Sequence, residues 1–369
     1  MKVGARHYRS IWPVESAGGA RAVGIVDQTR LPFEFVTVEL DSWIEVARAI
    51  RSMRVRGAPL IGVAGAYGFA LAMREQPDDA TLVRVHTELL ATRPTAVNLR
   101  WALDRMRRLL ERTPRAVRAE TAWTEAGRVA EEDIACNRAL GGHGARLIAA
   151  LQAARGRTVH VLTHCNAGWI ATVDFGTALS AIYQAFDAGI DLHVWVDETR
   201  PRNQGLLTAW ELEAHGVPHT LVVDNAGGHL MRRGQVDLVL VGADRVTRAG
   251  DVCNKIGTYL KAVAARDNDV PFYAAVPSTT IDWTITDADA IAIEERSGDE
   301  VRRVEGRGAD GRAASVAIAR ETTAVLNPGF DVTPSRLVTG IITERGIAAP
   351  SALVTLFSEM PRAPEPAAV

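Results

Sequence analysis

Residues 158–178 read TVHVLTHCNAGWIATVDFGTA, and the rest of the chain is organised around this stretch. Val159, Val161 and Leu162 predict a buried strand, which breaks into a polar corner at residues 163–166 (THCN). The turn residues Ala167-Gly168 then lead into a small-residue segment that predicts a helix over 169–187. A thiol and an amide at a strand end, just ahead of a helix, occupy a position where α/β proteins carry out chemistry.

The composition indicates an ordinary globular protein. At 369 residues the chain is long enough for two domains, and its 47% hydrophobic and 23% charged content is typical of soluble folds. A net charge of −2 produces no positive electrostatic field that would attract nucleic acid or an anionic membrane. No apolar run is long enough for a transmembrane helix, and the first 15 residues lack the apolar core of a signal peptide. We therefore expect a cytoplasmic protein with no nucleic-acid or membrane partner.

The cysteine pattern argues against a disulfide framework or a structural zinc site. Cys136, Cys165 and Cys253 are odd in number and form no CxxC pair. His160 and His164 would lie on one face of a strand but more than about 12 Å apart, too far to share a metal ion. We expect no metal and no cofactor, and a core or orienting role for His164.

Residues 1–150 predict a mainly helical domain with a short β segment. Residues 22–26 and 33–38 predict strands, and Ser42 and Glu45 form a capping box at the start of the first helix. Helical periodicity follows over 59–74, 79–91, 96–112 and 115–150.

Two glycine patterns lie in this region. Gly62, Gly65 and Gly68 predict a bare helical stripe for close packing rather than a dinucleotide loop. Residues 141–144 (GGHG) follow no strand and form no GxGxxG, so we interpret them as a bend or helix irregularity.

Residues 151–360 predict a Rossmann-like domain without a dinucleotide fingerprint. Strands are expected at 158–163, 191–197, 219–223, 237–242, 271–276 and 290–293, with helices near 169–187, 204–215, 226–233 and 254–266. Apolar strands separated by helices predict a parallel sheet covered on both faces. The tail over 361–369 is expected to be disordered.

Three predicted strand ends carry polar clusters, at residues 163–166, 197–205 and 242–255. If the strands are parallel, these clusters share one edge of the sheet, where ligands bind in such folds. Cys165 fits either a buried apolar position or a thiolate activated by the following helix. Asp244 fits either a turn or a carboxyl whose pKa is raised for use as an acid. Lys255 stands out because only three of the 42 basic residues are lysines.

Two arginines precede predicted helices in rigid contexts, Arg56 in RGAP and Arg93 in RPTAVN. An arginine beside the free N–H groups of a helix N-terminus suits a phosphate, although each arginine also fits an ordinary surface charge.

Taken together, these segments resemble the methylthioribose-1-phosphate isomerase family, which shares a superfamily with the regulatory subunits of translation initiation factor 2B. The blocks that carry the resemblance span most of the chain: RGAPLIGVAGAYG (56–68), RPTAVNLRWAL (93–103), LTHCNAGWIATVDFGTAL (162–179), DETRPRNQGLLTAWEL (197–212), GADRVTRAGDVCNKIGTY (242–259), PFYAAVPSTTID (271–282), ERSGDEV (295–301) and NPGFDVTPSRLVTGIITERG (327–346).

The resemblance implies roles for nine residues. The catalytic pair falls on Cys165 and Asp244. The substrate contacts fall on Arg56, Gly57, Ala58, Arg93, Gln204, Asn254 and Lys255. The chain departs from the family pattern at Ala292, at Gly329 and in the long segment 306–323, none of which touches the pair.

The resemblance also implies a homodimer built through the second domain, and conversion of 5-methylthio-α-D-ribose 1-phosphate to 5-methylthio-D-ribulose 1-phosphate in methionine salvage. In this reaction Asp244 would donate a proton to the ring oxygen. The C2 hydrogen would then move either through Cys165 thiolate or as a hydride to C1.

Two alternatives remain open. One is a related isomerase acting on 5-deoxyribose 1-phosphate or ribose 1,5-bisphosphate, and the other is a non-catalytic protein like the initiation-factor subunits. Retention of Cys165, Asp244 and the arginines favours an enzyme. Trp12, Trp101 and Trp169 fit either a methylthio pocket or the core.

Overall fold

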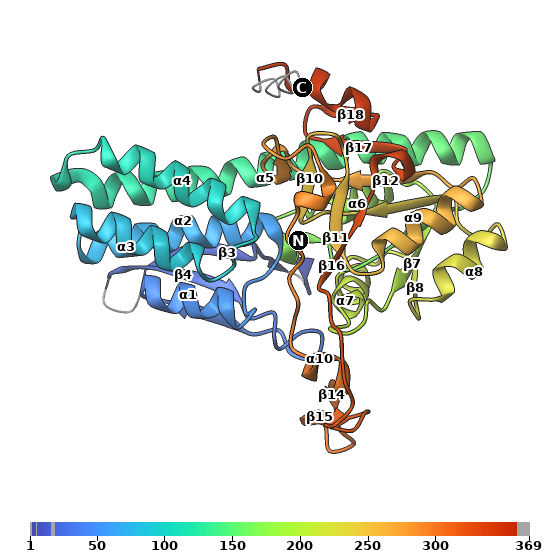
Figure 1. The fold of residues 1–369 in the computed structure, drawn as a ribbon, viewed down its shortest axis with the longest axis horizontal. Helices are drawn as coiled ribbons and strands as arrows, with labels where there is room; N and C mark the ends of the chain where they lie inside the picture. Colours follow the sequence, from blue (N-terminus) through green and yellow to red (C-terminus); the bar gives the residue numbers. More distant parts are fainter. Residues whose placement is uncertain (1, 5, 16–18, 360–369) are drawn as a thin grey trace, which may run out of the picture.

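The computed structural model describes residues 2–4, 6–15 and 19–359 (Figure 1). The tail that the sequence predicts to be disordered, residues 361–369, lies outside these ranges. Within the described residues, no helix is both long and apolar enough to cross a membrane.

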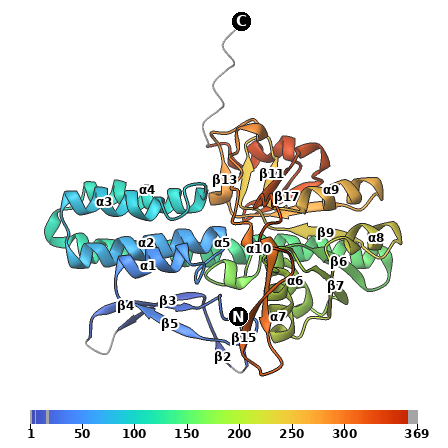
Figure 2. The ribbon, with the colours of Figure 1, turned by 60° about the horizontal axis from the view of Figure 1, so that its bottom comes forward.

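The first part of the chain is helical and rests on a small antiparallel sheet (Figure 2). The sheet has the order β3-β4-β5, and two-residue strands β1 and β2 form a separate ribbon. The elements are β1 (Lys2–Val3), β2 (Arg6–His7), β3 (Ile11–Glu15), β4 (Arg21–Val26), β5 (Thr37–Leu40), α1 (Trp43–Arg51), α2 (Ala58–Glu75), α3 (Asp79–Leu90), α4 (Val97–Glu111) and α5 (Arg118–Arg155). The predicted helices are all present, and Ser42 caps α1 by accepting the Glu45 N–H.

The predicted strand over 33–38 is wrong in position. Residues 31–33 form a turn, and the strand begins only at Thr37. The Phe33 side chain is 47% exposed, so it does not pack in the core as the side chain of a buried strand residue would.

The glycine stripe of α2 packs as predicted. A Cβ on Gly62 would lie 2.8 Å from the Asn98 carbonyl oxygen, and one on Gly65 would lie 2.6 Å from Leu99 Cδ1. The prediction of a bend at residues 141–144 is wrong, because α5 continues unbroken through them. Their glycines instead let α5 approach α6, since a Cβ added at Gly144 would lie only 2.4 Å from Ala181 Cβ.

The second part of the chain is built on a seven-stranded sheet in the order β18-β17-β12-β9-β6-β7-β8. All neighbours are parallel except β18, which is antiparallel to β17. The strands are β6 (Val159–Thr163), β7 (Leu192–Asp197), β8 (His219–Val222), β9 (Leu238–Val241), β12 (Phe272–Ala275), β17 (Gly340–Thr343) and β18 (Gly346–Ala348). The helices are α6 (Ala178–Asp187), α7 (Gly205–His215), α8 (Ala226–Arg232) and α9 (Thr258–Asp267).

Both faces of this sheet are covered, which explains its continuous apolar strands. Leu238 and Leu240 of β9 pack in the core shared with α6, whereas Val239 and Val241 pack in the core on the α9 side. The predicted mixed α/β fold, with a helical first part and a largely parallel sheet, is confirmed.

Two expected elements differ. No strand forms over 290–293, where the chain leaves a 3-10 turn (Ala288–Ala290) in irregular backbone. The expected helix over 169–187 is a short turn, Trp169–Ala171, then irregular backbone, and α6 begins only at Ala178. The Thr172 hydroxyl accepts a hydrogen bond from the Gly176 N–H and donates one to the Asp174 carbonyl. These side-chain bonds take the place of the backbone hydrogen bonds that a helix would form in this segment.

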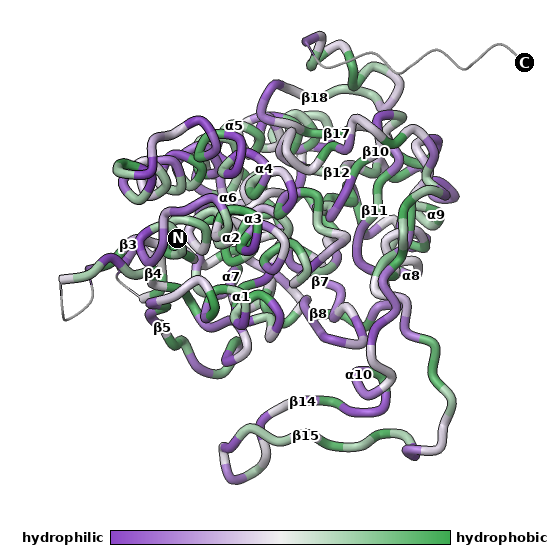
Figure 3. The backbone as a smooth tube through the Cα atoms, turned by 60° about the vertical axis from the view of Figure 1, so that its left-hand side comes forward, coloured by the Kyte–Doolittle hydropathy of each residue, from purple (hydrophilic) through white to green (hydrophobic). Residues whose placement is uncertain are grey.

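A second, four-stranded sheet in the order β13-β10-β11-β16 was not predicted. Its strands are β10 (Arg245–Thr247), β11 (Val252–Lys255), β13 (Ile281–Asp282) and β16 (Phe330–Thr333). A short helix α10 (Asp299–Arg302) precedes an exposed hairpin of β14 (Arg303–Arg307) and β15 (Ala313–Ala317), which projects from the body in Figures 1 and 3.

Candidate active site

The two residues expected to act as a catalytic pair follow neighbouring strands at the centre of the main sheet. Cys165 comes two residues after β6, and Asp244 comes three residues after β9. From β6 the chain builds outward through β7 and β8, then returns to place β9 and β12 on the other side of β6. The strand order therefore reverses between β6 and β9, which is where open α/β sheets bind ligands.

All nine residues expected in the site line one cavity at this edge. The cavity has a volume of about 80 Å³, and the nine residues are Arg56, Gly57, Ala58, Arg93, Cys165, Gln204, Asp244, Asn254 and Lys255. They come from both parts of the chain, so the cavity lies where the helical part meets the sheet. Their individual roles stay predictions.

Gly57 forms the floor at the start of α2. Its φ of 105° is a conformation that favours glycine, and a Cβ there would lie 2.3 Å from the Ala171 carbonyl oxygen. Because a side chain cannot fit, the backbone before α2 approaches the loop after Cys165 directly. Ala58 and Pro59, at the N-terminus of α2, line the cavity, and the positive end of the helix dipole there suits an anion.

The Arg56 guanidinium is held by the loop that carries the thiol. It donates to the Asn166 side-chain oxygen and, over 3.3 Å, to the Asn166 carbonyl. Asn166 is fixed in turn, because its amide donates to Glu211 Oε1 at 2.8 Å. Glu211 is acceptor-only as a carboxylate and Arg56 is donor-only, so the two residues determine which way the Asn166 amide points.

Three of the expected substrate contacts present buried polar atoms with no hydrogen-bond partner among the described residues. These atoms are Arg56 Nε, Arg93 Nε and Gln204 Oε1. Buried polar groups in folded proteins are nearly always paired, because burying one without a partner costs about 1–3 kcal/mol. The same three side chains also line the cavity, so these unpaired atoms lie close to where a polar ligand would bind.

Burial raises the pKa of the Cys165 thiol, and the nearby Lys255 and Arg56 charges only partly oppose this effect. Activation by a following helix, one of the two possibilities left open from the sequence, does not fit the structure, since α6 begins only 13 residues after Cys165 and burial disfavours the thiolate. The backbone of Cys165 has a φ of 66°, which is uncommon for a residue with a side chain.

Burial also raises the pKa of the Asp244 carboxyl, against the lowering influence of Lys255, Arg93 and Arg56. A carboxyl with a raised pKa keeps its proton at higher pH and can act as a general acid. The direction of this shift agrees with the second of the two possibilities left open for Asp244, and its role as an acid stays a prediction.

The missed strand β11 delivers the remaining contacts. Lys255 Nζ donates to the Gly329 carbonyl at 2.9 Å and lies 4.2 Å from the centre of the Phe330 ring. Asn254 is 5% exposed, and its amide donates to Thr258 Oγ1. Short strands without alternation carry little sequence signal, which explains why the motif was recognisable and the strand was not.

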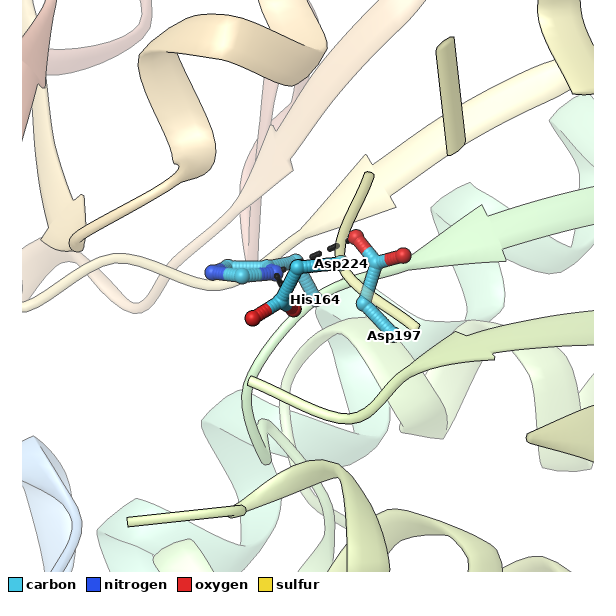
Figure 4. Close-up of side chains that lie close together, drawn as sticks. All are labelled: His164, Asp197 and Asp224. Atoms are coloured by element: carbon cyan, nitrogen blue, oxygen red, sulfur yellow. Dashed lines mark hydrogen bonds and ion pairs between the residues drawn. The ribbon is translucent and has the colours of Figure 1, made fainter. Parts of the chain in front are cut away.

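His164 also lines the cavity, and its ring lies between two carboxylates (Figure 4). Its Nδ1 lies 3.2 Å from Asp197 Oδ2 and 3.8 Å from Asp224 Oδ1, while its Nε2 lies 2.8 Å from the Ile256 carbonyl. The three side chains could offer one ligand each to a metal ion. However, Lys261 Nζ already lies 3.1 Å from Asp197 Oδ2, so a cation pairs with this carboxylate within the chain itself. The orienting role expected for His164 fits this network.

A second cavity of about 50 Å³ adjoins the first and shares Asp244 and Arg93 with it. Its apolar lining is Ile61, Ala96, Ile291, Ala292 and Phe330. None of the three tryptophans considered from the sequence lines either cavity. Trp169 is fully buried, and Trp12 packs against Gly24.

Sequence reasoning singled out the Asn166 amide but missed that Thr199, Thr208 and Glu211 support the site. Thr199 stands inside a polar cluster of the sequence. Thr208 and Glu211 lie on α7, and what marks them is that they are polar side chains buried in a helix, which the sequence alone does not show.

Comparison with known proteins shows the family of the chain. The model of the initiation factor 2 subunit family matches residues 54–350. Methylthioribose-1-phosphate isomerase from Brucella anthropi is 60% identical over 365 residues, covering 97% of this chain and 100% of that protein. The crystal structure of 5-methylthioribose 1-phosphate isomerase from Pyrococcus horikoshii superposes with a TM-score of 0.82 at 38% identity, covering 96% of this chain and 97% of that one.

A structure described as subunit delta of translation initiation factor eIF-2B, from A. fulgidus, is also similar, with a TM-score of 0.77 at 39% identity over 95% of this chain and 100% of that one. The matched family model covers most of the sequence, and the 60% identity extends over nearly all of it. The chain therefore belongs to the methylthioribose-1-phosphate isomerase family, a branch of the initiation factor 2 subunit family.

Proposed function

We propose that the protein is an aldose–ketose isomerase that converts 5-methylthio-α-D-ribose 1-phosphate to 5-methylthio-D-ribulose 1-phosphate, a step of methionine salvage. Relatives about 60% identical over nearly the whole chain carry the name of this enzyme. The observation that carries the proposal is the placement of Cys165 and Asp244 just after the two strands where the sheet order reverses, in one cavity that Arg56 and Arg93 also line.

The substrate requires ring opening before isomerisation, because its C1 is locked as a phosphate ester. Protonated Asp244 donates its proton to the ring oxygen as the C1–O bond breaks, and positive charge develops at C1. The hydrogen on C2 then moves with its electron pair to C1. The C2 hydroxyl releases its proton to the Asp244 carboxylate, directly or through water, which leaves the ketone and restores the acid.

The state of Cys165 favours this hydride route over proton abstraction. A general base must be deprotonated, and the raised pKa of the thiol keeps Cys165 neutral in the free site. A neutral thiol instead fills the space beside C1 and C2, where it excludes water that would trap a cationic intermediate. Arg56 and Arg93 hold the phosphate, and Gln204, Asn254 and Lys255 contact the sugar hydroxyls.

The second cavity supports a methylthio group at C5 of the substrate. Its lining is mainly apolar, and the guanidinium of its Arg245 donates to the Thr95 carbonyl and lies 3.6 Å from Asp282. Arg93 also lines this cavity but is assigned here to the C1 phosphate, so a C5 phosphate would lack a cation of its own, whereas a thioether needs only apolar surface.

An assay of the purified chain against three sugar phosphates tests the function. The substrates are 5-methylthioribose 1-phosphate, 5-deoxyribose 1-phosphate and ribose 1,5-bisphosphate. We expect kcat/KM to be highest for the methylthio compound and lowest for the bisphosphate. A preference for another substrate would reassign the enzyme, and no turnover of any would support a non-catalytic role like that of the initiation-factor subunits.

We also propose that the protein is a cytoplasmic homodimer built through its second part. All three cysteines are free, which fits a reducing compartment. On α9, Tyr259, Leu260 and Val263 expose apolar side chains, with Leu260 62% exposed. Adjacent exposed apolar residues on one helix mark a surface that a second copy would cover.

Sedimentation of Leu260→Glu tests this surface. The wild type should sediment at twice the chain mass of 39.8 kDa, and the variant should shift toward the monomer. Val83→Glu is the matched control, because Val83 is 51% exposed on α3. A monomeric wild type would refute the homodimer, and a dimeric Leu260→Glu would refute the α9 surface.

A further inference from the structure

Two threonines hold the backbone of Cys165 from both sides, and we propose that Thr199 and Thr208 are positioning residues for its thiol. This inference rests on the proposed function, because it gives the pair a purpose in the isomerisation. Neither residue carries a group for the chemistry itself, since neither lines the cavity that holds Cys165 and Asp244.

The two hydrogen bonds meet at one residue. The Cys165 N–H donates to Thr199 Oγ1 at 2.8 Å, and the Thr208 hydroxyl donates to the Cys165 carbonyl at 2.8 Å. Both threonines are buried, at 0% and 1% exposure, so water does not compete for these bonds. Cys165 thus has its two backbone polar groups satisfied by side chains rather than by a strand or helix.

This arrangement matters because Cys165 has a φ of 66°. A residue with a side chain stays in the left-handed region only where its surroundings enforce it. The two hydroxyls supply that enforcement, since relaxation of the turn would break one or both bonds. The conformation in turn sets the direction in which the thiol leaves the backbone.

Thr199 is itself tightly held. Its N–H and that of Arg200 donate to the two carboxylate oxygens of Asp224, each at 2.8 Å. Its hydroxyl donates to the Asp197 carbonyl at 3.0 Å, which leaves the oxygen lone pairs free to accept from Cys165. Thr199 has a φ of 63°, which is unusual for a β-branched residue. The backbone strain at Cys165 is therefore shared by Thr199, the residue that holds its N–H.

Thr208 connects the thiol to the expected phosphate site. Its hydroxyl oxygen also accepts from the Asn166 amide at 3.1 Å, and Asn166 holds Arg56. Thr208 lies one turn along α7 from Gln204, whose carbonyl accepts its N–H. We call the pair Thr199 and Thr208 the clamp. The clamp therefore fixes the position of the thiol relative to the residues that would hold the two ends of the substrate.

Substitutions that keep or remove the hydroxyl test the clamp. We expect Thr199→Val and Thr208→Val to lower kcat by about tenfold or more while KM changes less than about threefold, because misplacing a group by about 1 Å costs up to 100-fold. Thr199→Ser and Thr208→Ser keep the hydroxyl and should stay within about threefold of wild-type kcat. Thr343→Val is the matched control, because Thr343 is equally buried at 0% exposure and its hydroxyl donates to Gly346.

Alkylation of Cys165 by iodoacetamide, followed by mass spectrometry of its peptide, gives a readout independent of turnover. Both valine variants should react at least about threefold more slowly, because a relaxed turn withdraws the thiol from the cavity. If the valine variants do not fold, Thr→Ala variants at both positions, which add no bulk, make the same comparison.

Folded variants without the hydroxyl that keep wild-type kcat and alkylation rate would overturn the clamp. Serine variants that fail to restore either rate would overturn it too, because the hydroxyl would then not be the group that matters. A wild type that turns over no sugar phosphate would instead refute the proposed function, while the alkylation rates would still decide the clamp.

Discussion

At the scale of single residues, the site depends on a thiol and a carboxyl whose charged forms are disfavoured by burial. Burial raises the pKa of both the Cys165 thiol and the Asp244 carboxyl. In the proposed mechanism a neutral thiol and a neutral acid open the sugar ring and exclude water, but the thiol provides no base to take the C2 hydrogen as a proton. The chemistry that fits this pair is a hydride shift.

Isomerisation in D₂O tests this route. The product should carry little solvent deuterium at C1, measured by proton NMR, because the migrating hydrogen never exchanges with water. A companion reaction of C2-deuterated substrate with Cys165→Ser should proceed at reduced rate and still deliver the label to C1.

Substantial solvent deuterium at C1 in the wild-type product would rule out a pure hydride shift. Complete loss of turnover in a folded Cys165→Ser would indicate that the thiol carries the proton itself.

The residues that line the site could be foreseen from the sequence, and their supports could not. Cys165, Asp244, Arg56 and Lys255 stand in dense polar motifs, so their types and spacing mark them. Thr208 is one polar residue on a helix, and its importance comes from a bond to a carbonyl 43 residues away. The direction of the pKa shift at Cys165 was also not foreseeable, because it depends on burial by distant segments.

At the scale of elements, α5 joins the two parts of the molecule. It packs against α2 and α4 at one end, and against α6 and the strands β6, β12 and β17 at the other. Glycines set how closely it approaches α6, so the sequence pattern that looked like a bend is a contact surface.

Paired glycine substitutions in α5 test this interpretation. Gly127→Ala should raise the free energy of unfolding by about 0.5–1 kcal/mol, because a Cβ there meets nothing within 4 Å and alanine favours the helix. Gly144→Ala should lower it by about 1–3 kcal/mol, because the same Cβ would lie 2.4 Å from Ala181 Cβ. Urea unfolding measures both, and an equal effect of the two changes would contradict the packing role.

A partly buried acid on α5, Asp133, predicts a pH dependence of stability. Burial raises the pKa of Asp133 to about 7, from the ordinary aspartate value of 3.8, although its carboxylate accepts the Val173 N–H at 2.8 Å. Between these values the folded chain holds a proton that the unfolded chain has released. The free energy of unfolding should therefore fall as the pH rises from about 4 to about 7.

Thermal unfolding from pH 5 to pH 8 measures this effect. The Tm of Asp133→Asn should fall less over this range than that of the wild type, because asparagine does not titrate. Glu75→Gln, at an exposed carboxyl, should leave the wild-type slope unchanged. Parallel Tm profiles for wild type and Asp133→Asn would show that Asp133 does not hold its proton.

The elements that the sequence predicted best are those with a long repeat. Helices α2 to α5 and strands β6, β7, β9 and β12 bury regular apolar patterns, so periodicity locates them. Residues 290–293 have apolar side chains but no neighbouring strand, and Ile291 and Ala292 face the second cavity instead. A local pattern cannot distinguish these two uses of an apolar residue.

At the scale of the whole molecule, the candidate site lies where the two parts meet. Arg56 and Arg93 come from the helical part, while Cys165 and Asp244 come from the sheet. Direct contacts join the parts beside the cavity, including Arg93 with Glu294 and Arg245 with the Thr95 carbonyl. We continue to propose a domain division near residues 150 and 151, close to the end of α5.

The central claim is that the protein isomerises 5-methylthioribose 1-phosphate with Asp244 as the acid. Phosphorus NMR of this substrate with wild type and with Asp244→Asn tests it most directly. The wild type should form the ketose phosphate, and the variant should have a kcat lower by about 100-fold or more, because asparagine cannot donate the proton. A wild type that forms no product, or a folded Asp244→Asn with near-normal kcat, would contradict the claim.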